Sequence, residues 1–276
     1  MGFALYIFSL RSLRSPRLKC KMKKISVAII TKNEEANIRG CLESVRWADD
    51  IVVVDSGSTD QTLKICGQFP VRVFEEEWKG FARQKNSAIA KTRHEWILSL
   101  DADERVTEKL KEEIDQTLHS DPPVDGYLVA RKNFFLGRWI KHCGWYPDHN
   151  LRLFRKERGS FVEREVHEKA TVKGEVGCLQ EPLEHYTYRT LSDFIQRADR
   201  YSSLAAREMW REGRRFRRAD LLFRPPFTFF QMYLLRAGFL EGHWGFLLSV
   251  LYSFYTFAKY SKLKEIHGLE DPRPSK

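Results

Sequence analysis

Two aspartates, Asp101 and Asp103, stand one residue apart at the end of the short apolar run WILSLDADE, residues 96–104. Such a run, bounded by charge, is typical of a buried strand, and open α/β sheets bind ligands beyond the carboxyl ends of their strands. Side chains two positions apart on an extended chain point to the same side, so we expect these carboxylates to converge. Converging carboxylates repel each other unless a cation lies between them, and Mg²⁺ is often held by one or two carboxylates plus substrate phosphates. The pair therefore predicts a Mg²⁺ site that also takes substrate phosphates, with a solvated acidic turn before a helix at Thr107 as the alternative.

The elements that must position these aspartates are strands that alternate with helices. Apolar runs at residues 25–31, 51–54, 71–74 and 96–100 predict four strands. Helices are expected up to about Val45, up to about Gln68, and at residues 81–91 and 107–118. This alternation implies βαβ units in a parallel sheet. Polar clusters at residues 31–34, 55–60 and 101–104 then end three strands on one edge. No glycine-rich dinucleotide motif or P-loop is present.

The second half of the chain has a different pattern. Residues 126–135 and 150–155 predict strands of a mixed or antiparallel part. A helical region is expected from a cap at Ser192 to about Arg218, and Pro225-Pro226 is expected to end it. Residues 227–260 are rich in aromatic side chains, and their uncharged stretch 242–258 is at the short limit for crossing a bilayer. We expect amphipathic helices that lie in a membrane interface or pack on the rest of the protein. A true membrane span is the alternative.

Charge and cysteine content limit the possible settings. The net charge is +10 over 276 residues, and residues 1–24 contain basic but no acidic side chains. Such a balance favours an anionic partner, namely a membrane surface, a nucleic acid or an acidic substrate. The five cysteines form no C-x-x-C pair, which argues against a zinc site or a disulfide framework and favours a reducing cytosol. The apolar start precedes the basic residues, the wrong order for a secretory signal. We expect residues 1–21 to be a poorly ordered tail, with Met22 an alternative first residue.

Four motifs in order, IITKNEEANI, VVVDSGSTDQT, GFARQKNSAI and LSLDADE, resemble family 2 of the glycosyltransferases, over about residues 25–188. Members are inverting enzymes with the A-type nucleotide-sugar fold. The later pieces NLRLFRK, REVHEKA and EHYTYRT, with the aromatic tail, resemble the subgroup that adds a hexose to the inner core of lipopolysaccharide. The resemblance implies an α/β fold with a mixed, mostly parallel sheet flanked by helices, and a helical, aromatic-rich C-terminal part. The expected division is a basic tail at 1–24, a catalytic domain at 25–190 and a helical acceptor-proximal region at 191–276.

The resemblance also implies roles for single residues. Contacts to the nucleotide sugar fall on Thr31, Asn33, Glu34, Asp55, Arg83, Lys85 and Asp101. Asp55 would bond the base, although a strand-end acid that caps the next turn is the alternative. Arg83 and Lys85 would lie near the diphosphate, although a solvated helix face is equally consistent with them.

The metal and the catalytic base complete the implied site. Asp103 would bind Mg²⁺ or Mn²⁺, and His185 would be a further metal contact or else a structural histidine. Glu168 matches the catalytic base, although the Glu-Asp pair usual there is His167-Glu168 in this chain. The alternative for Glu168 is a surface residue on a strand. A partly desolvated carboxylate suits this work because its pKa rises toward working pH.

The function that the resemblance implies is single, inverting transfer of a hexose, expected to be glucose, from a UDP-sugar to a hydroxyl of a lipid-linked saccharide. The expected acceptor is the heptose of the lipopolysaccharide inner core. The expected location is cytoplasmic, at the inner face of the cytoplasmic membrane. The Q-x-x-R-W motif of processive synthases is absent, which favours a single transfer. Polyprenyl phosphate or another cell-envelope acceptor is the alternative within enzymes. A basic nucleic-acid-binding protein is the alternative of another class, but it rests on net charge alone, and we expect no nucleic acid partner.

Overall fold

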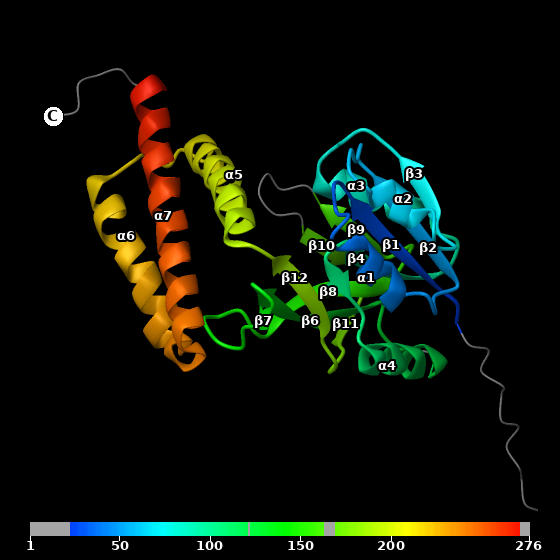
Figure 1. Cartoon of the computed structure of the whole chain (residues 1–276). Coiled ribbons are helices and arrows are strands. Elements are labelled where there is room, and N and C mark those ends of the chain that lie inside the picture. Colours follow the sequence, from blue (N-terminus) through cyan, green and yellow to red (C-terminus); the bar gives the residue numbers. More distant parts are fainter. Residues whose placement is uncertain (1–22, 121, 163–168, 271–276) are drawn as a thin grey trace, which may run out of the picture.

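The computed structural model describes residues 23–120, 122–162 and 169–270. An α/β part with a large mixed sheet is followed by a group of C-terminal helices (Figure 1). The strands are β1 (Ile25–Thr31), β2 (Asp50–Asp55), β3 (Arg72–Glu75), β4 (Trp96–Asp101), β5 (Glu104–Arg105), β6 (Gly126–Phe135), β7 (Arg138–Trp139), β8 (Asp148–Arg155), β9 (Gly159–Val162), β10 (Lys169–Val172), β11 (Val176–Cys178) and β12 (Leu183–Tyr188). The helices are α1 (Ile38–Ser44), α2 (Thr62–Cys66), α3 (Phe81–Ala90), α4 (Glu108–His119), α5 (Leu191–Arg211), α6 (Arg218–Phe230), the short η1 (Gln231–Leu235) and η2 (Gly238–Glu241), and α7 (His243–Glu270).

The sheet is mixed and mostly parallel, as predicted. Its order is β3-β2-β1-β4-β8-β6-β12-β5, with β7 and β11 pairing with β6. The first four strands are parallel, and β8 pairs antiparallel with both β4 and β6. β1 is buried on both faces because Val27 and Ile29 pack with α1 and α4, whereas Ala28 and Ile30 pack with α3. Burial of both faces explains why these strands have almost no polar residues.

The parallel register aligns the strand ends that carry the polar clusters. Thr31 pairs with Asp55 across β1 and β2, and Ile30 pairs with Asp101 across β1 and β4. After β4 the chain turns at residues 102–103 and enters β5, which pairs antiparallel with β12. β12 in turn runs parallel to β6. The acidic turn is therefore held between the sheet edge and a strand from much later in the chain.

The C-terminal helices depart from the sequence-based expectation in three details. The α5 cap is Thr190, not Ser192, since the Thr190 hydroxyl accepts from the Asp193 N–H and the Asp193 carboxylate accepts from the Thr190 N–H. The helix ends at Arg211 instead of about Arg218. Pro225-Pro226 does not end a helix but lies inside α6. The Pro225 carbonyl accepts a hydrogen bond from the Ser253 hydroxyl of α7, so packing against α7 helps to support α6 at this point.

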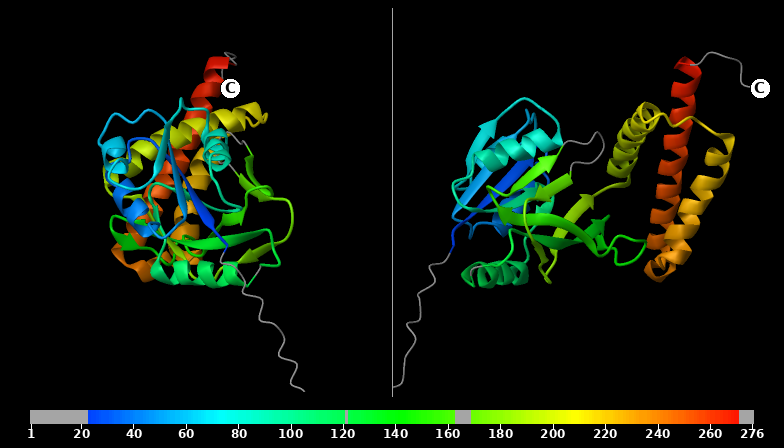
Figure 2. Two further views of the ribbon diagram at one scale, coloured as in Figure 1. Left: turned by 90° about the vertical axis from the view of Figure 1, so that its right-hand side faces the viewer. Right: turned by 180° about the vertical axis from the view of Figure 1, so that it is seen from behind.

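The helices and the sheet share one apolar contact region. Phe135 at the end of β6 packs with Phe194 of α5, Met232 of η1 and Leu248 of α7. Figures 1 and 2 show α5 nearest to the sheet and α6 on the outer side of α7. No helix among residues 23–120, 122–162 and 169–270 is long and apolar enough to cross a bilayer. The expected N-terminal tail lies outside the described residues except for Lys23 and Lys24.

Candidate active site

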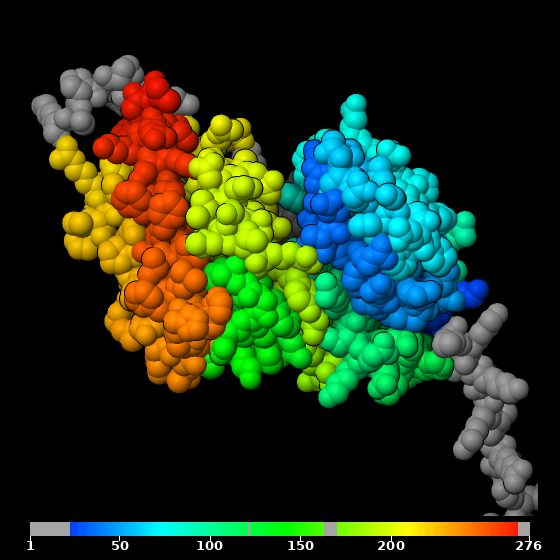
Figure 3. Space-filling view, viewed as in Figure 1, coloured from blue at the N-terminus to red at the C-terminus, as the bar shows by residue number. Residues whose placement is uncertain are grey.

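A cleft of about 1420 Å³ lies at the carboxyl edge of the sheet and extends to the C-terminal helices. Figure 3 shows the surface hollowed between α5 and the first strands and helices of the chain. The wall on the sheet side includes Thr31, Asn33, Glu34, Asp101, Asp103 and His185, and the opposite wall comes from α5, η1 and α7. Six of the residues singled out in the sequence are thus brought together in one cavity.

Asp101, the last residue of β4, is surrounded by basic side chains. Its carboxylate lies 2.7 Å from Lys85 Nζ of α3 and 2.8 Å from an Arg152 nitrogen of β8. Burial alone would raise the pKa of Asp101, but Lys85 and Arg152 outweigh burial and hold that pKa well below its ordinary value. Arg152 also pairs with the fully buried Glu104, whose carboxylate accepts the Asp101 N–H at 3.0 Å. The aspartate is therefore ionised and rigidly placed at the floor of the cleft.

The expected geometry of the two aspartates is only partly found. Both line the cleft, but the chain turns at residues 102–103 instead of staying extended. The Asp103 carboxylate consequently has partners of its own, His185 Nε2 at 3.4 Å and an Arg197 nitrogen at 3.9 Å. Burial alone would raise the pKa of Asp103, but the charge of His185 lowers it below its ordinary value.

The orientation of His185 follows from a chain of hydrogen bonds. Asn133 Nδ2 donates to the Trp145 carbonyl at 2.9 Å and lies 3.3 Å from the Asp148 carboxylate. Asn133 Oδ1 must then face His185 Nδ1, at 2.6 Å, so Nδ1 carries a proton. His185 Nε2 is directed toward Asp103, where it either donates a proton or presents a lone pair. A histidine oriented in this way by a second residue is the usual arrangement of a metal ligand.

The donor set fits a divalent cation that shares its coordination with a ligand. No group of three or more His, Cys, Asp or Glu side chains in the described part of the chain could hold a metal ion. Asp103 and His185 nevertheless provide one carboxylate oxygen and one imidazole nitrogen 3.4 Å apart. Mg²⁺ usually keeps several waters and takes one or two protein ligands together with substrate phosphates. Two facing donors beside an open cleft meet that requirement.

The loop after β1 forms the outer part of the same wall. Asn33 has a positive φ of 54°, and its side-chain oxygen accepts from the Thr59 N–H at 2.8 Å. Burial, with the charge of Asp103 as the next cause, raises the pKa of Glu34. Thr31 Oγ1 is buried and has no hydrogen-bond partner among the described residues.

Three other predicted residues within the described part of the chain, Asp55, Arg83 and Lys85, do not line the cleft. Asp55 is fully buried, and its oxygens accept hydrogen bonds from the backbone of Gly57 and from the backbone and hydroxyl of Ser58. It thus shapes the turn beside Asn33, and its contact with the base stays a prediction. Arg83 lies exposed on α3, whereas Lys85 of the same helix is buried beside Asp101.

The predicted base, Glu168, lies outside the described residues, so its place relative to Asp103 stays a prediction. Glu168 directly precedes β10 in the sequence, and β9, the partner strand of β10, contacts α3. Phe161 of β9 is held by two hydrogen bonds to Asn86 of α3, and its ring lies 5.1 Å from Lys85 Nζ.

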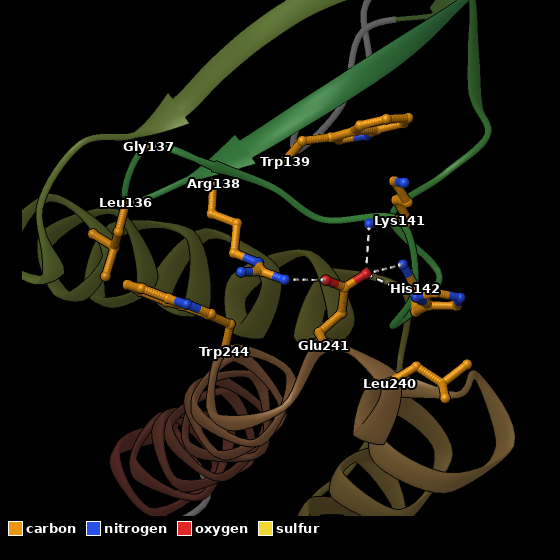
Figure 4. Close-up of a pocket in the computed structure, with 9 residues that line it drawn as sticks. All are labelled: Leu136, Gly137, Arg138, Trp139, Lys141, His142, Leu240, Glu241 and Trp244. Carbon is orange, nitrogen blue, oxygen red and sulfur yellow. Dashed lines mark hydrogen bonds and ion pairs between the residues drawn. The ribbon is translucent and has the colours of Figure 1, made fainter.

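A second hollow, of about 740 Å³, lies where η2 meets the segment after β6 (Figure 4). The carboxylate of Glu241 is at its centre and accepts from the N–H groups of Lys141 and His142, at 2.9 and 3.1 Å, and from His142 Nδ1 at 2.8 Å. Arg138 lies 3.7 Å from the same carboxylate. These bonds join the C-terminal helices to the sheet, which is a structural role.

Sequence reasoning missed several residues that shape the site. Asn133 could have been singled out, because it is a polar residue within the predicted strand 126–135. A buried polar side chain needs hydrogen-bond partners. Arg197 gave no such signal, since it is one of many basic residues on a predicted helix. Arg152, a basic residue inside the predicted strand 150–155, forms buried ion pairs with Asp101 and Glu104.

Comparisons with known proteins point to one class. The family model described as Glycosyl transferase family 2 matches residues 26–173. The lipopolysaccharide core biosynthesis glycosyltransferase LpsC of Rhizobium meliloti (strain 1021) is 31% identical over 258 residues, covering 89% of this chain and 94% of that protein. Among solved structures, S. aureus TarS 1–349 in complex with UDP-GlcNAc has a TM-score of 0.47 at 15% identity, covering 90% of this chain and 92% of that one. Glucosyl-3-phosphoglycerate synthase from Mycobacterium tuberculosis has a TM-score of 0.46 at 17% identity, covering 70% and 81%.

Proposed function

The chain belongs to glycosyl transferase family 2 and has the A-type fold of that family, and from this premise we propose that it moves a hexose from a UDP-sugar to a hydroxyl of a lipid-linked saccharide. Similarity to LpsC, named for lipopolysaccharide core biosynthesis, supports a saccharide of the lipopolysaccharide core as acceptor. The heptose of the inner core follows from the family resemblance alone. The uracil base and glucose as the hexose follow from the family resemblance alone. The observation that carries the proposal is the cleft in which Asp101, Asp103 and His185 meet.

In the proposed reaction, the acceptor hydroxyl attacks the anomeric carbon from the side opposite the diphosphate. A carbon–oxygen bond to the acceptor forms as the bond to the diphosphate oxygen breaks, so the configuration inverts. Glu168 takes the proton of the attacking hydroxyl. One such base is sufficient, since no second carboxylate has to act as a nucleophile.

The leaving group carries negative charge, and the sheet side of the cleft would bind it. Asp103 and His185 would hold Mg²⁺ or Mn²⁺, which when bound neutralises the leaving diphosphate. Asp101 would contact the ribose or the sugar, with Lys85 fixing its position, and Arg83 would lie near the diphosphate. Thr31, Asn33 and Glu34 would cradle the base, and their place in the lining of the cleft supports that assignment. Asp55 would act through the turn that it caps.

We also propose that residues 25–190 form the catalytic domain and that residues 191–276 bring it to the membrane. The support is an apolar face on α6, η1, η2 and α7, made of Leu222, Phe223, Phe227, Phe230, Leu234, Leu235, Phe239, Leu240, Phe246, Val250, Phe254 and Phe257, all exposed. Exposed arginines border it, among them Arg217, Arg218 and Arg224. Apolar side chains bordered by cations suit an anionic membrane such as the inner face of the cytoplasmic membrane.

The test is nucleotide release from a panel of sugar donors, with and without Mg²⁺ or Mn²⁺, using core lipopolysaccharide as acceptor. We expect metal-dependent release, and loss of at least 100-fold in Asp103→Asn because the variant loses a metal ligand. Glu108→Gln on the exposed surface of α4 is the control and should keep wild-type activity. Wild-type activity in folded Asp103→Asn contradicts the proposed site. Transfer to polyprenyl phosphate but not to core saccharide would favour the alternative acceptor.

A further inference from the structure

The half of the cleft that lies away from the sheet has its own chemical character. It is lined by α5, η1, α7 and the segment before β8, and its side chains include Trp145, Arg200, Tyr201, Arg236, Tyr252 and Tyr255. The acidic residues among the described lining residues are Glu34, Asp101, Asp103 and Asp148, and all of them come from the α/β part. The cleft is therefore acidic at one end and basic and aromatic at the other.

The two arginines Arg200 and Arg236 are not neutralised within this end. Neither has a carboxylate within 4.0 Å among the described residues, whereas Arg197 of the same wall lies 3.9 Å from Asp103. Among the residues that the structure describes, the polar contact of the Arg200 guanidinium is the Tyr201 hydroxyl at 3.5 Å, and the guanidinium carbon lies 5.0 Å from the Tyr201 ring centre. Two cations without a counter-charge in one cavity favour an anionic ligand.

The side chain of Arg236 occupies space that is free because residue 144 is a glycine. A Cβ atom on Gly144 would lie 2.5 Å from one guanidinium nitrogen of Arg236 and 2.6 Å from its Cδ. Gly144 also has a positive φ of 77°, and the N–H of the neighbouring Cys143 donates to the Arg236 carbonyl at 2.9 Å. The positive φ favours glycine at residue 144, and the lack of a side chain there leaves room for Arg236 along the cleft wall.

The aromatic side chains suit a saccharide. Trp145 lies 6.2 Å from Tyr252, and Tyr252 lies 6.4 Å from Tyr255, measured between ring centres. Burial raises the pKa of Tyr252 and of Tyr255, so both hydroxyls stay protonated and can donate hydrogen bonds. Flat apolar faces with hydroxyl groups at their ends are typical of sites for ligands that are part apolar and part polar.

We propose that this end of the cleft is an acceptor subsite that selects saccharides carrying a phosphate group, which Arg200 and Arg236 bind. The inference rests on the proposed function, because it assumes that the cleft takes a saccharide acceptor beside the donor. Arginine suits the task because its planar guanidinium donates two parallel hydrogen bonds to a phosphate. The phosphate is placed on the sugar and not in a lipid headgroup, since Tyr201 lies beside Arg200 and the other aromatic side chains line the same end of the cleft.

The test uses deacylated lipopolysaccharide core oligosaccharide, which contains no lipid headgroup. Binding of this oligosaccharide is compared before and after phosphatase treatment. Binding is measured by titration calorimetry, which does not depend on turnover. We expect the wild type to bind the phosphorylated form at least tenfold more tightly. Arg200→Gln with Arg236→Gln should weaken binding of the phosphorylated form roughly 100-fold and change the dephosphorylated form less than threefold. Equal binding of the two forms by the wild type overturns the inference, and so does an equal loss for both in the variant.

Two further variants separate the site from general charge and folding effects. Lys109→Gln with Arg207→Gln removes the same charge from exposed positions outside the cleft and should keep the phosphate preference. Gly144→Ala keeps both arginines but displaces Arg236, so it should lose the preference for the phosphorylated form. Loss of preference in the surface variant overturns the inference. An intact phosphate preference without transfer from any donor would count against the proposed function and not against this subsite.

Discussion

At the residue scale, the candidate site depends on which atoms are held by neighbours and which face the cleft. Asp101 is neutralised by Lys85 and Arg152, so it is a fixed anion with little freedom to bind a cation alone. Asp103 instead faces a histidine, and Asn133 holds that histidine so that Nε2 is directed at the carboxylate. The two aspartates of one short motif therefore have different proposed roles because their neighbours differ.

The first prediction concerns Asn133 as a positioning residue. Asn133→Ala removes the acceptor for His185 Nδ1–H, so the ring is free to turn away from Asp103. We expect the Mn²⁺ concentration for half-maximal nucleotide release to rise 10–100-fold, as is usual when a partner of a metal ligand is lost. The measurement is a metal titration of activity at saturating donor. Gln116→Ala, at an exposed position of α4, is the control. An unchanged metal titration in Asn133→Ala would contradict the proposed role of Asn133 in positioning His185.

At the scale of elements, contacts between neighbouring segments keep the cleft walls in place. The segment after β3 is tied to α3 by Glu76, whose carboxylate lies 2.5 Å from Lys91 Nζ and accepts from the Ser87 hydroxyl at 2.8 Å. The hydrogen bond to Lys91 is the largest cause that lowers the pKa of Glu76, to about 2. Since α3 also carries Lys85, this contact supports the floor of the site.

The second prediction is the pH dependence that follows from Glu76. A carboxyl whose pKa is lowered by folding stabilises the protein above its unfolded pKa, about 4.3, and loses that contribution as pH falls toward the folded pKa, about 2. Glu76→Gln should therefore lower the free energy of unfolding by about 1 kcal/mol at pH 7. The difference from wild type should shrink between about pH 4.5 and pH 2.

The measurement is urea unfolding of both proteins across this pH range. Glu77→Gln, one residue along and exposed, changes the same charge and should differ little from wild type at any pH. If the loss of unfolding free energy in Glu76→Gln stays constant down to pH 2, the contact of Glu76 with α3 does not depend on ionisation.

At the scale of the whole molecule, two sides of α7 have different surroundings. Tyr252 and Tyr255 line the cleft, whereas Phe246, Val250 and Phe254 are exposed. With 3.6 residues per turn, these two sets fall on opposite sides of the helix. The even spread of apolar residues around α7 is thus explained by one side packed inside the protein and another left for a partner.

The third prediction tests that partner. Phe227→Ser with Phe254→Ser removes two exposed aromatic rings from the apolar face and should lower binding to phosphatidylglycerol-containing vesicles at least tenfold. Transfer to a soluble acceptor should stay within twofold of wild type. The measurement is vesicle cosedimentation. Val176→Ser with Leu269→Ser, exposed positions outside this face, is the control, and equal vesicle binding by all three proteins would contradict the membrane role.

Much of the α/β part was predictable because its signals are local. A strand buried on both faces must be apolar along its length, so 25–31 was placed correctly from its apolar, β-branched residues alone. Polar clusters at strand ends must meet at one edge when the strands are parallel, and the structure brings Thr31 and Asp101 into one cleft. Pro225 was placed wrongly because its local tendency to end a helix is outweighed by packing of α6 against α7.

Only the tertiary structure decided which distant parts of the chain are in contact. His185 meets Asn133 because β12 pairs with β6, and it meets Asp103 because β12 also pairs with β5. The basic end of the cleft exists because α5, η1 and α7 pack against the end of β6 around Phe135. Such pairings depend on the summed packing of many residues, so no single stretch of sequence contains them. The sequence by itself determined which side chains were available at the strand ends, and long-range packing determined which of them face one another.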